Sequence, residues 1–155
     1  MELTSTTIPE GGTIPLAHCG TRCGGHNVSP SLAWTGAPSA TSSFALLCID
    51  PDAPIEGGWW HWAVHDIPAD CVHLPEGGPL PVGAREWRND YGAFRWDGPC
   101  PPPGPAHHYV FTLHALDVPT LRLPTDWPKE RARELVLFHS LATATLTGTF
   151  GRRPR

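Results

Sequence analysis

The chain has 155 residues, of which 40% are hydrophobic, and a formal net charge of −4. This length can bury one sizeable core and is short for two ordinary domains, so we expect a single domain over residues 1–155. Lysine and arginine together number 11 against 15 acidic residues, and the lack of a basic tract argues against a nucleic-acid-binding protein.

The first residues, MELTS, lack the basic and then apolar pattern of a signal peptide, and no apolar run reaches the roughly 18 residues of a membrane helix. We therefore expect a cytoplasmic protein without a transmembrane segment. The five cysteines are an odd number, and free thiols are the default in a reducing compartment, so we expect no disulfide framework. Cys19 and Cys23 lie with His18 and His26 at a spacing that mimics a zinc site. Weighing this alternative against the motifs described below, we expect no metal and no cofactor.

Short clusters of proline and glycine punctuate the chain, with 19 and 16 residues respectively. Many turns between short strands are typical of a sandwich or a barrel. The first clear strand is SFALLCI at 43–49, an apolar run that predicts a central strand buried on both faces. Cys48 within it should be a small core residue, and Asp50 follows at the strand end.

A second strand is expected from Trp60 to Ile67. Because side chains alternate between the two faces of a strand, His61, Ala63 and His65 should share one face.

A third strand is expected over 108–116. The same alternation makes His107 and Tyr109 project together with Phe111. His108 lies on the opposite face and should therefore be outside a pocket formed by that pair.

Near the C-terminus, Thr125 or Asp126 followed by Pro128 starts a predicted helix that runs to about Leu141. Its apolar residues at helical spacing are Leu135, Phe138 and Leu141. The last strand covers 143–150 and alternates threonine with apolar or small residues. The whole pattern predicts a mainly β protein, a two-sheet antiparallel β-sandwich with short peripheral helices.

Acidic and histidine residues gather in rigid or glycine-bearing segments. These are DPDAP at 50–54, GWWHW at 58–62, GPCPPPG at 98–104 and HHY at 107–109. Because proline fixes φ and glycine admits backbone geometries that other residues avoid, the segments can hold polar side chains in place with little ordering cost on binding. They predict a preformed ligand pocket.

These motifs, preceded by NVSPSLAW at 27–34, resemble the phosphatidylethanolamine-binding protein family in its bacterial, Raf-kinase-inhibitor-like branch. The resemblance covers about residues 14–150, and motifs in family order make chance agreement improbable. It implies the sandwich fold of the family and a ligand pocket. The pocket residues carried over from the family are Asp50, Asp52, His61, His107 and Tyr109.

Two further statements rest on the resemblance. Gly24 and His26 stand where the family more often has an acid, which argues against a ligand contact from that loop. The peptide Ala53–Pro54 is expected to be cis and to turn the acid loop toward the pocket, since a tertiary amide adopts cis at a cost of about 0.5–1 kcal/mol.

The chemistry of these groups favours a small-anion or phospho-headgroup binding protein. Imidazoles and a phenol donate hydrogen bonds to phosphate or carboxylate oxygens, and backbone N–H groups of the loop that begins with Gly98 and Pro99 can add more. Asp50 would repel a free anion, so we expect it to accept the second N–H of His61 or to meet a cationic amine. Large aromatic walls from the neighbouring tryptophans suit a small-molecule site.

An enzyme on the same scaffold is the alternative. Asp50 beside His61, with a phenol across an apolar pocket, suffices for acid–base dehydration, isomerisation or cyclisation. A serine or cysteine hydrolase has less support, because no serine or cysteine lies in a convincing context for activation. The sequence leaves a homodimer open, and a family name is no evidence for a kinase partner. The remaining histidines are expected to be structural or exposed; they are His65, His73, His114 and His139.

Overall fold

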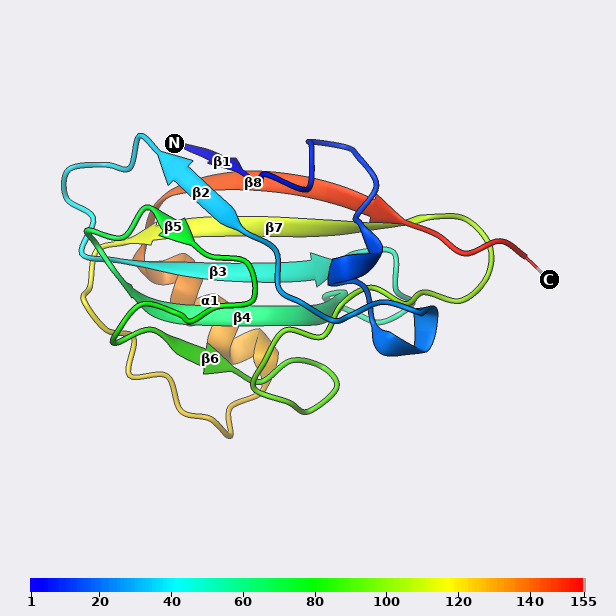
Figure 1. Ribbon diagram of the computed structural model, residues 1–155. Helices are drawn as coiled ribbons and strands as arrows, with labels where there is room; N and C mark the ends of the chain where they lie inside the picture. The colour runs from blue at the N-terminus through cyan, green and yellow to red at the C-terminus, as the bar shows by residue number, and fades with distance from the viewer. Residues whose placement is uncertain (155) are drawn as a thin grey trace.

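Two antiparallel sheets stack on each other in the computed structural model, which describes residues 1–154 (Figure 1). The strands are β1 (Glu2–Thr4), β2 (Leu32–Thr35), β3 (Ser43–Asp50), β4 (Trp59–Pro68), β5 (His73–Leu74), β6 (Arg85–Trp87), β7 (His107–Leu116) and β8 (Ser140–Phe150). The smaller sheet has the order β1-β2-β5 and the larger one β6-β4-β3-β7-β8. The helical segments are the 3-10 turns η1 (Leu16–His18) and η2 (Thr21–Cys23) and the helix α1 (Lys129–His139). The predicted two-sheet antiparallel sandwich with short helices is confirmed.

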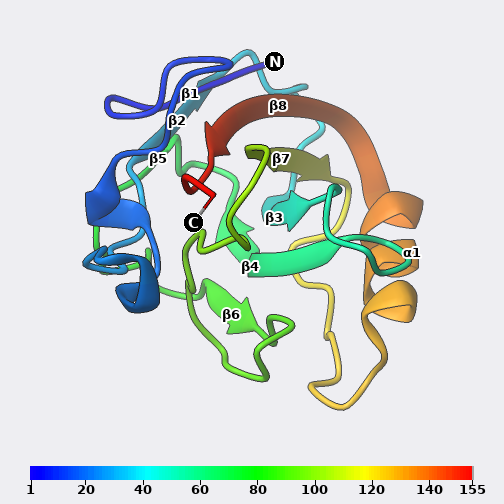
Figure 2. The same cartoon turned by 90° about the vertical axis from the view of Figure 1, so that its right-hand side faces the viewer.

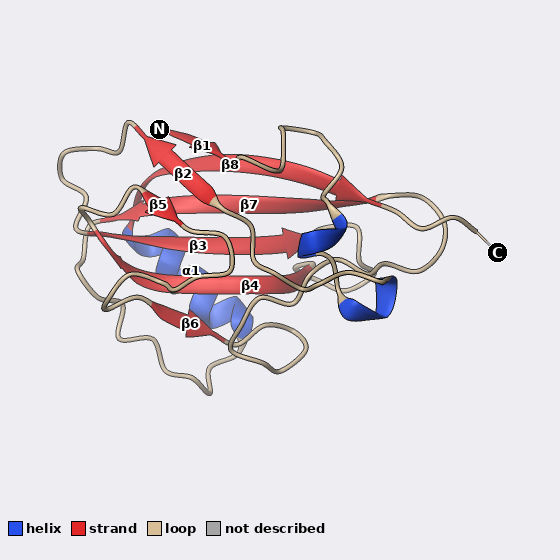
Figure 3. Ribbon diagram, viewed as in Figure 1, coloured by secondary structure: helices blue, strands red, loops and turns tan. Residues whose placement is uncertain are grey.

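The main core lies between the two sheets, and a second apolar layer lies between the larger sheet and α1 (Figure 2). Figure 3 shows how the long strands run side by side while the helix crosses behind them. β3 occupies the centre of the larger sheet and is buried on both faces, as its apolar run predicts. Cys48 is fully buried within it as a free thiol.

Helix α1 buries a different face from the one that its large apolar residues suggest. Ala132 and Val136, one helical turn apart, are its buried residues. Phe138 is 81% exposed, and Leu141 already belongs to β8. No helix of the described chain, residues 1–154, is long and apolar enough to cross a membrane.

A bulge in β4 changes the direction of His61. The pairing of β3 with β4 shifts register between Trp60 and Trp62, so His61 is the extra residue. Ala63 packs toward α1, whereas the His61 ring lies 5.1 Å from the Tyr109 ring, in the layer between the sheets. The prediction that His61 shares a face with Ala63 is therefore wrong, because it assumed unbroken alternation.

Two of the five cysteines are not the free thiols that we expected. Cys23 of η2 forms a disulfide with Cys100, 77 residues further along the chain, whereas we expected free thiols. The two loops that carry them lie side by side, which sequence spacing could not reveal. Cys23 is consequently not available as a thiolate ligand for zinc. Cys19, Cys48 and Cys71 are free.

One smaller prediction is also corrected. The cis peptide found among residues 1–154 is Gly78–Pro79, so the prediction for Ala53–Pro54 is wrong. The end of the described chain is tied to the loop beside the disulfide, because Gly104 donates its N–H to the carbonyl of Arg152 at 3.0 Å.

His114 makes the fold sensitive to acid. Burial, and after it the positive charge of Arg133, lowers the pKa of His114 from 6.5 to about 4. The unfolded chain then binds a proton more readily than the folded one, so the contribution to stability is complete above pH 6.5 and is lost as pH falls toward 4. We expect this histidine to account for about 3 kcal/mol of acid destabilisation.

The measurement is urea unfolding at several pH values across that window. His114→Leu should flatten the dependence of the free energy of unfolding on pH, whereas replacing the exposed His73 with Leu should leave it unchanged. If the free energy of unfolding depends on pH equally in His114→Leu and in the unsubstituted protein, His114 is not the source of the acid sensitivity.

Candidate functional site

The candidate site lies where the end of β3 meets the beginnings of β4 and β7. Because β3 is antiparallel to both neighbours, Asp50 pairs with Trp59, and Ile49 with Val110. The motifs at 50–54, 58–62 and 107–109 therefore converge on one end of the larger sheet, which faces the viewer in Figure 2.

A cavity of about 340 Å³ opens at this end of the sheet. Five of the predicted site residues line it, namely Asp50, Asp52, His61, His107 and Tyr109. The other lining residues are Ala53, Pro54, Trp59, Tyr91, Cys100, Pro101 and Pro102. This volume suits a small molecule.

Asp50 is buried, and both oxygens of its carboxylate are engaged. Oδ2 accepts Nδ1–H of His107 at 2.6 Å, and Oδ1 accepts the backbone N–H of Asp52 at 2.8 Å. We expected Asp50 either to accept the N–H of His61 or to meet a cationic amine; the first alternative is wrong. His107 keeps its second ring nitrogen, Nε2, for the cavity that its side chain lines.

The bulged His61 binds the backbone instead. Its Nδ1 lies 2.6 Å from the carbonyl oxygen of Asp97, which can only accept, so Nδ1 carries the proton. Burial lowers the pKa of His61, which is therefore neutral at pH 7. Nε2 then holds a free lone pair and acts as a hydrogen-bond acceptor or a base.

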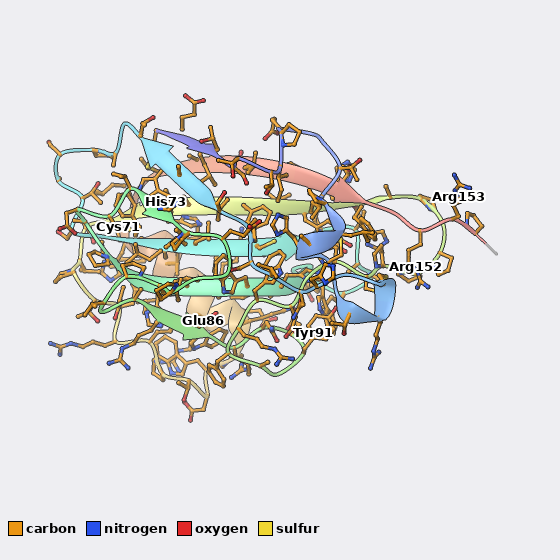
Figure 4. The ribbon with its side chains drawn as sticks, viewed as in Figure 1. Cys71, His73, Glu86, Tyr91, Arg152 and Arg153 are labelled. Carbon is orange, nitrogen blue, oxygen red and sulfur yellow. A yellow bond between two sulfur atoms is a disulfide. The ribbon has the colours of Figure 1, made fainter. Side chains whose placement is uncertain are left out.

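Two tyrosine hydroxyls supply donors. Burial, and after it the negative charge of Asp50, raises the pKa of Tyr109 above its usual range, and burial also raises the pKa of Tyr91. Both hydroxyls therefore stay protonated at neutral pH. The Tyr91 ring, labelled in Figure 4, meets the Trp59 ring edge to face at 5.1 Å. The indole Nε1 of Trp59 is buried and has no hydrogen-bond partner among residues 1–154.

One wall of the cavity is the proline-rich loop after Asp97. Cys100, Pro101 and Pro102 face the cavity, and the disulfide joins Cys100 to η2. Proline restricts the backbone of this loop and the disulfide restrains its position, so the wall is set before a ligand arrives.

Gly98 and Pro99 lie behind that wall. The Gly98 N–H donates to Oδ1 of Asn27 at 2.7 Å, and the Pro99 carbonyl accepts the N–H of Gly20 at 2.9 Å. These predicted site residues thus fix the wall to the loop at 20–27.

Asp52 sits at the rim beside His108. Its Oδ2 accepts the backbone N–H of His108 at 2.7 Å and Nδ1–H at 2.8 Å. These hydrogen bonds, the backbone one first, lower the pKa of Asp52. His108 does not line the cavity.

Sequence reasoning missed Tyr91 as a lining residue. The turn that carries it is organised by Asn89, whose Oδ1 accepts the N–H groups of Tyr91 and Ala93 at 2.9 and 3.0 Å. Asn, Asp and Gly are ordinary turn residues, so the segment Asn–Asp–Tyr–Gly predicts a turn and does not indicate a ligand site. Over residues 1–154, no group of three or more histidine, cysteine and acidic side chains is placed to hold a metal ion.

The chain is similar in sequence and in structure to known proteins. Residues 4–151 match the family model described as phosphatidylethanolamine-binding protein. UPF0098 protein YbhB of Escherichia coli is 40% identical, with 97% of this chain and 99% of that protein covered. The crystal structure of YbcL from E. coli, described as a member of the mammalian PEBP family, superposes with a TM-score of 0.92 at 37% identity, covering 98% of each chain. The CT736 protein of Chlamydia trachomatis superposes with a TM-score of 0.85 at 33% identity over 97% of each chain.

Proposed function

Because the chain belongs to the phosphatidylethanolamine-binding protein family and groups with its bacterial members, we propose that the cavity binds a small anion. The ligand is phosphate or the phosphate of a phospho-headgroup, and it is bound without chemical conversion. The observation that carries this proposal is the Asp50–His107 pair at 2.6 Å beside the hydroxyls of Tyr109 and Tyr91.

Charge compensation explains how an anion can bind next to a buried carboxylate. When His107 is protonated, its positive charge offsets that of Asp50, and Nε2–H is a donor on the cavity side. The tyrosine hydroxyls add neutral donors. The aromatic rings of Trp59 and Tyr91 form an apolar part of the cavity wall.

Isothermal calorimetry with inorganic phosphate and with phosphoethanolamine tests the proposal. Both should bind, since they share the phosphate, and a tighter phosphoethanolamine complex would identify a contact to the amine. The control is His73→Ala, an exposed substitution on β5 that should bind like the unsubstituted protein. Absence of heat with both probes at millimolar concentration would refute anion binding.

The affinity for anions should rise as pH falls. A histidine titrates near pH ~6.5 when unperturbed, and only the protonated ring can donate from both nitrogens. Burial lowers the pKa of His61, so its contribution should come at the acid end of the range, and His61→Ala should remove that part. Sulfate is the suitable probe because its own charge stays constant. A flat affinity between about pH 5 and 8 would count against protonated histidine as the donor.

A second function, acid–base catalysis, is favoured by the tautomer of His61. Its Nδ1–H is held by the Asp97 carbonyl, so a neutral Nε2 with a free lone pair lines the cavity. A lowered pKa and a fixed orientation are properties of a general base. Dehydration, isomerisation or cyclisation of a small molecule is the reaction class that such a site serves.

Asp50→Asn separates the two functions. If the protein only binds, the amide keeps a hydrogen-bonding side chain next to His107, and the affinity should fall modestly. If it catalyses, with His61 as the base and the Asp50–His107 pair as the proton donor, loss of this carboxylate should slow turnover by about 10²–10⁴-fold. The measurements are turnover of a metabolite panel, binding by calorimetry and folding by circular dichroism. A selective loss of rate with intact binding would establish catalysis and displace simple binding.

A further inference from the structure

A second hollow lies at the other end of β4 from the cavity described above. The elements that bound it lie toward the lower left of Figure 1. It has a volume of about 870 Å³ and is bounded by the last residues of β4, by β6 and by the segment 119–125, which leads from β7 toward α1. We call it the Asp66 groove. None of its lining residues lines the cavity at the end of β3, which we call the Asp50 cavity.

The walls of the Asp66 groove are fixed to one another. Asp66 accepts the backbone N–H of Leu121 at 2.9 Å through Oδ1 and the hydroxyl of Thr120 at 2.8 Å through Oδ2. Arg88, the residue after β6, donates to the carbonyls of Thr125 and Trp127 at 2.5 and 2.7 Å. A ligand would therefore meet walls that already hold their positions, which lowers the ordering cost of binding.

The groove is lined by two arginines and two acidic residues, and the acids bind groups other than the arginines. Arg85 and Arg122 both line it and are exposed, and within residues 1–154 neither guanidinium has an ion-pair partner or a hydrogen bond. Asp66 already holds the segment 119–125 and also lies 3.0 Å from Nδ1 of the buried His65. The other acid of the lining, Glu86, accepts the indole N–H of Trp62 at 2.8 Å.

The two arginines come from two different segments that line the groove. Arg85 belongs to the edge strand β6 and is the cross-strand partner of His65, so its side chain starts beside the floor of the groove. Arg122 belongs to the segment 119–125. Two guanidinium groups at one groove fit an oxyanion with several oxygens, because each guanidinium offers a planar fork of donors.

The backbone of Arg122 gives independent support. Its φ is 49°, in the left-handed region that costs a residue with a side chain roughly 1–2 kcal/mol and that glycine adopts freely. Asp66 also has a left-handed φ, of 55°, but its carboxylate hydrogen bonds account for its presence. No hydrogen bond or ion pair of the Arg122 side chain within residues 1–154 offsets this conformational cost. Glycine would avoid the cost but would supply no positive charge to the groove.

We propose that the Asp66 groove is a second ligand site, which binds a soluble phosphate monoester of metabolite size. The phosphate oxygens accept hydrogen bonds from the guanidinium groups of Arg85 and Arg122. The rest of the molecule lies along the groove, where Thr125 and Ser42 offer hydroxyls. This site is separate from the Asp50 cavity and does not depend on the function proposed for it.

The test is a titration of ¹⁵N-labelled protein with sn-glycerol 3-phosphate, followed by NMR. Saturable shifts of the amide signals of Asp66, Arg85 and 120–125 are expected, and they should persist in His107→Ala, which removes a donor from the other cavity. Absence of saturable shifts at these amides up to millimolar ligand would overturn the proposal. So would association only with vesicles that contain phosphatidic acid, because the ligand would then be a membrane lipid.

Two substitutions separate binding from folding. Arg122→Gly removes the conformational strain of a non-glycine residue with a left-handed φ, so the variant should melt at the same temperature as the unsubstituted protein or higher. Its affinity for the phosphate monoester should fall at least about tenfold. Arg85→Gln should lower the affinity by a similar factor without touching that turn. The matched control is Arg153→Gln, which removes the same charge at the far end of the molecule (Figure 4). Unchanged affinity in both groove variants, or an equal loss in the control, would refute the site.

Discussion

His107→Ala is expected to weaken phosphate binding by about 100-fold, the size of effect seen at the most important positions of a binding site. The substitution removes a donor from the cavity and also leaves Asp50 alone. The Asp50 side chain is 5% exposed, and its Oδ2 loses a hydrogen bond of 2.6 Å. An uncompensated buried carboxylate repels an anion and should lower the free energy of unfolding by about 2 kcal/mol.

The chain contains its own control for this experiment. The next residue, His108, also pairs with an aspartate, but the side chains of His108 and Asp52 are 56% and 42% exposed. An exposed pair contributes little to stability. His108→Ala should therefore leave phosphate affinity and stability nearly unchanged. Comparable losses in the two variants, measured by calorimetry and by urea unfolding, would show that burial of the Asp50–His107 pair does not matter.

Gly98→Ala is expected to destabilise the protein by about 4 kcal/mol, an unusually large loss that a direct conflict with the backbone accounts for. A Cβ atom on Gly98 would lie 1.8 Å from the carbonyl oxygen of His18. Neither segment can retreat easily, because Gly98 also donates its N–H to Asn27. The proline-rich wall of the cavity should move, and ligand affinity should fall together with stability.

Gly20→Ala is the matched substitution in the facing loop. Its Cβ would lie 3.3 Å from the Gly98 carbonyl oxygen, a contact that a small shift accommodates. We expect a loss below about 1 kcal/mol. Thermal unfolding of both variants provides the comparison, and a Gly98→Ala protein as stable as Gly20→Ala would disprove the close approach.

The sequence predicted those parts of the fold that depend on local pattern. The apolar run at 43–49 and the alternation over 108–116 correspond to β3 and β7, since burial on one or two faces leaves a direct signature. The buried face of α1 was not predictable in the same way. Small residues, Ala132 and Val136, pack against the sheet there, while the larger Phe138 points away from it.

Five residues that line the cavity could be named from the sequence, whereas Tyr91 and the hydrogen bonds of the cavity could not. Alternation brings His107 and Tyr109 to the cavity, but the partner of Asp50 depends on the bulge at His61, and a single inserted residue has no sequence signature. Tyr91 reaches the cavity from a distant turn. The link between Cys23 and Cys100 arises only when the fold brings together loops far apart in sequence.

The bond between Cys23 and Cys100 connects the chemistry of two thiols to the occupancy of the cavity, because Cys100 is itself part of the cavity wall. Thermodynamic linkage makes such a connection reciprocal. If the bridged protein holds a ligand more tightly than the protein with free thiols, the ligand must protect the bridge from reduction by the same factor. Ligand concentration should then shift the equilibrium between disulfide and free thiols, and the redox potential of the surroundings should shift the fraction of protein that holds a ligand.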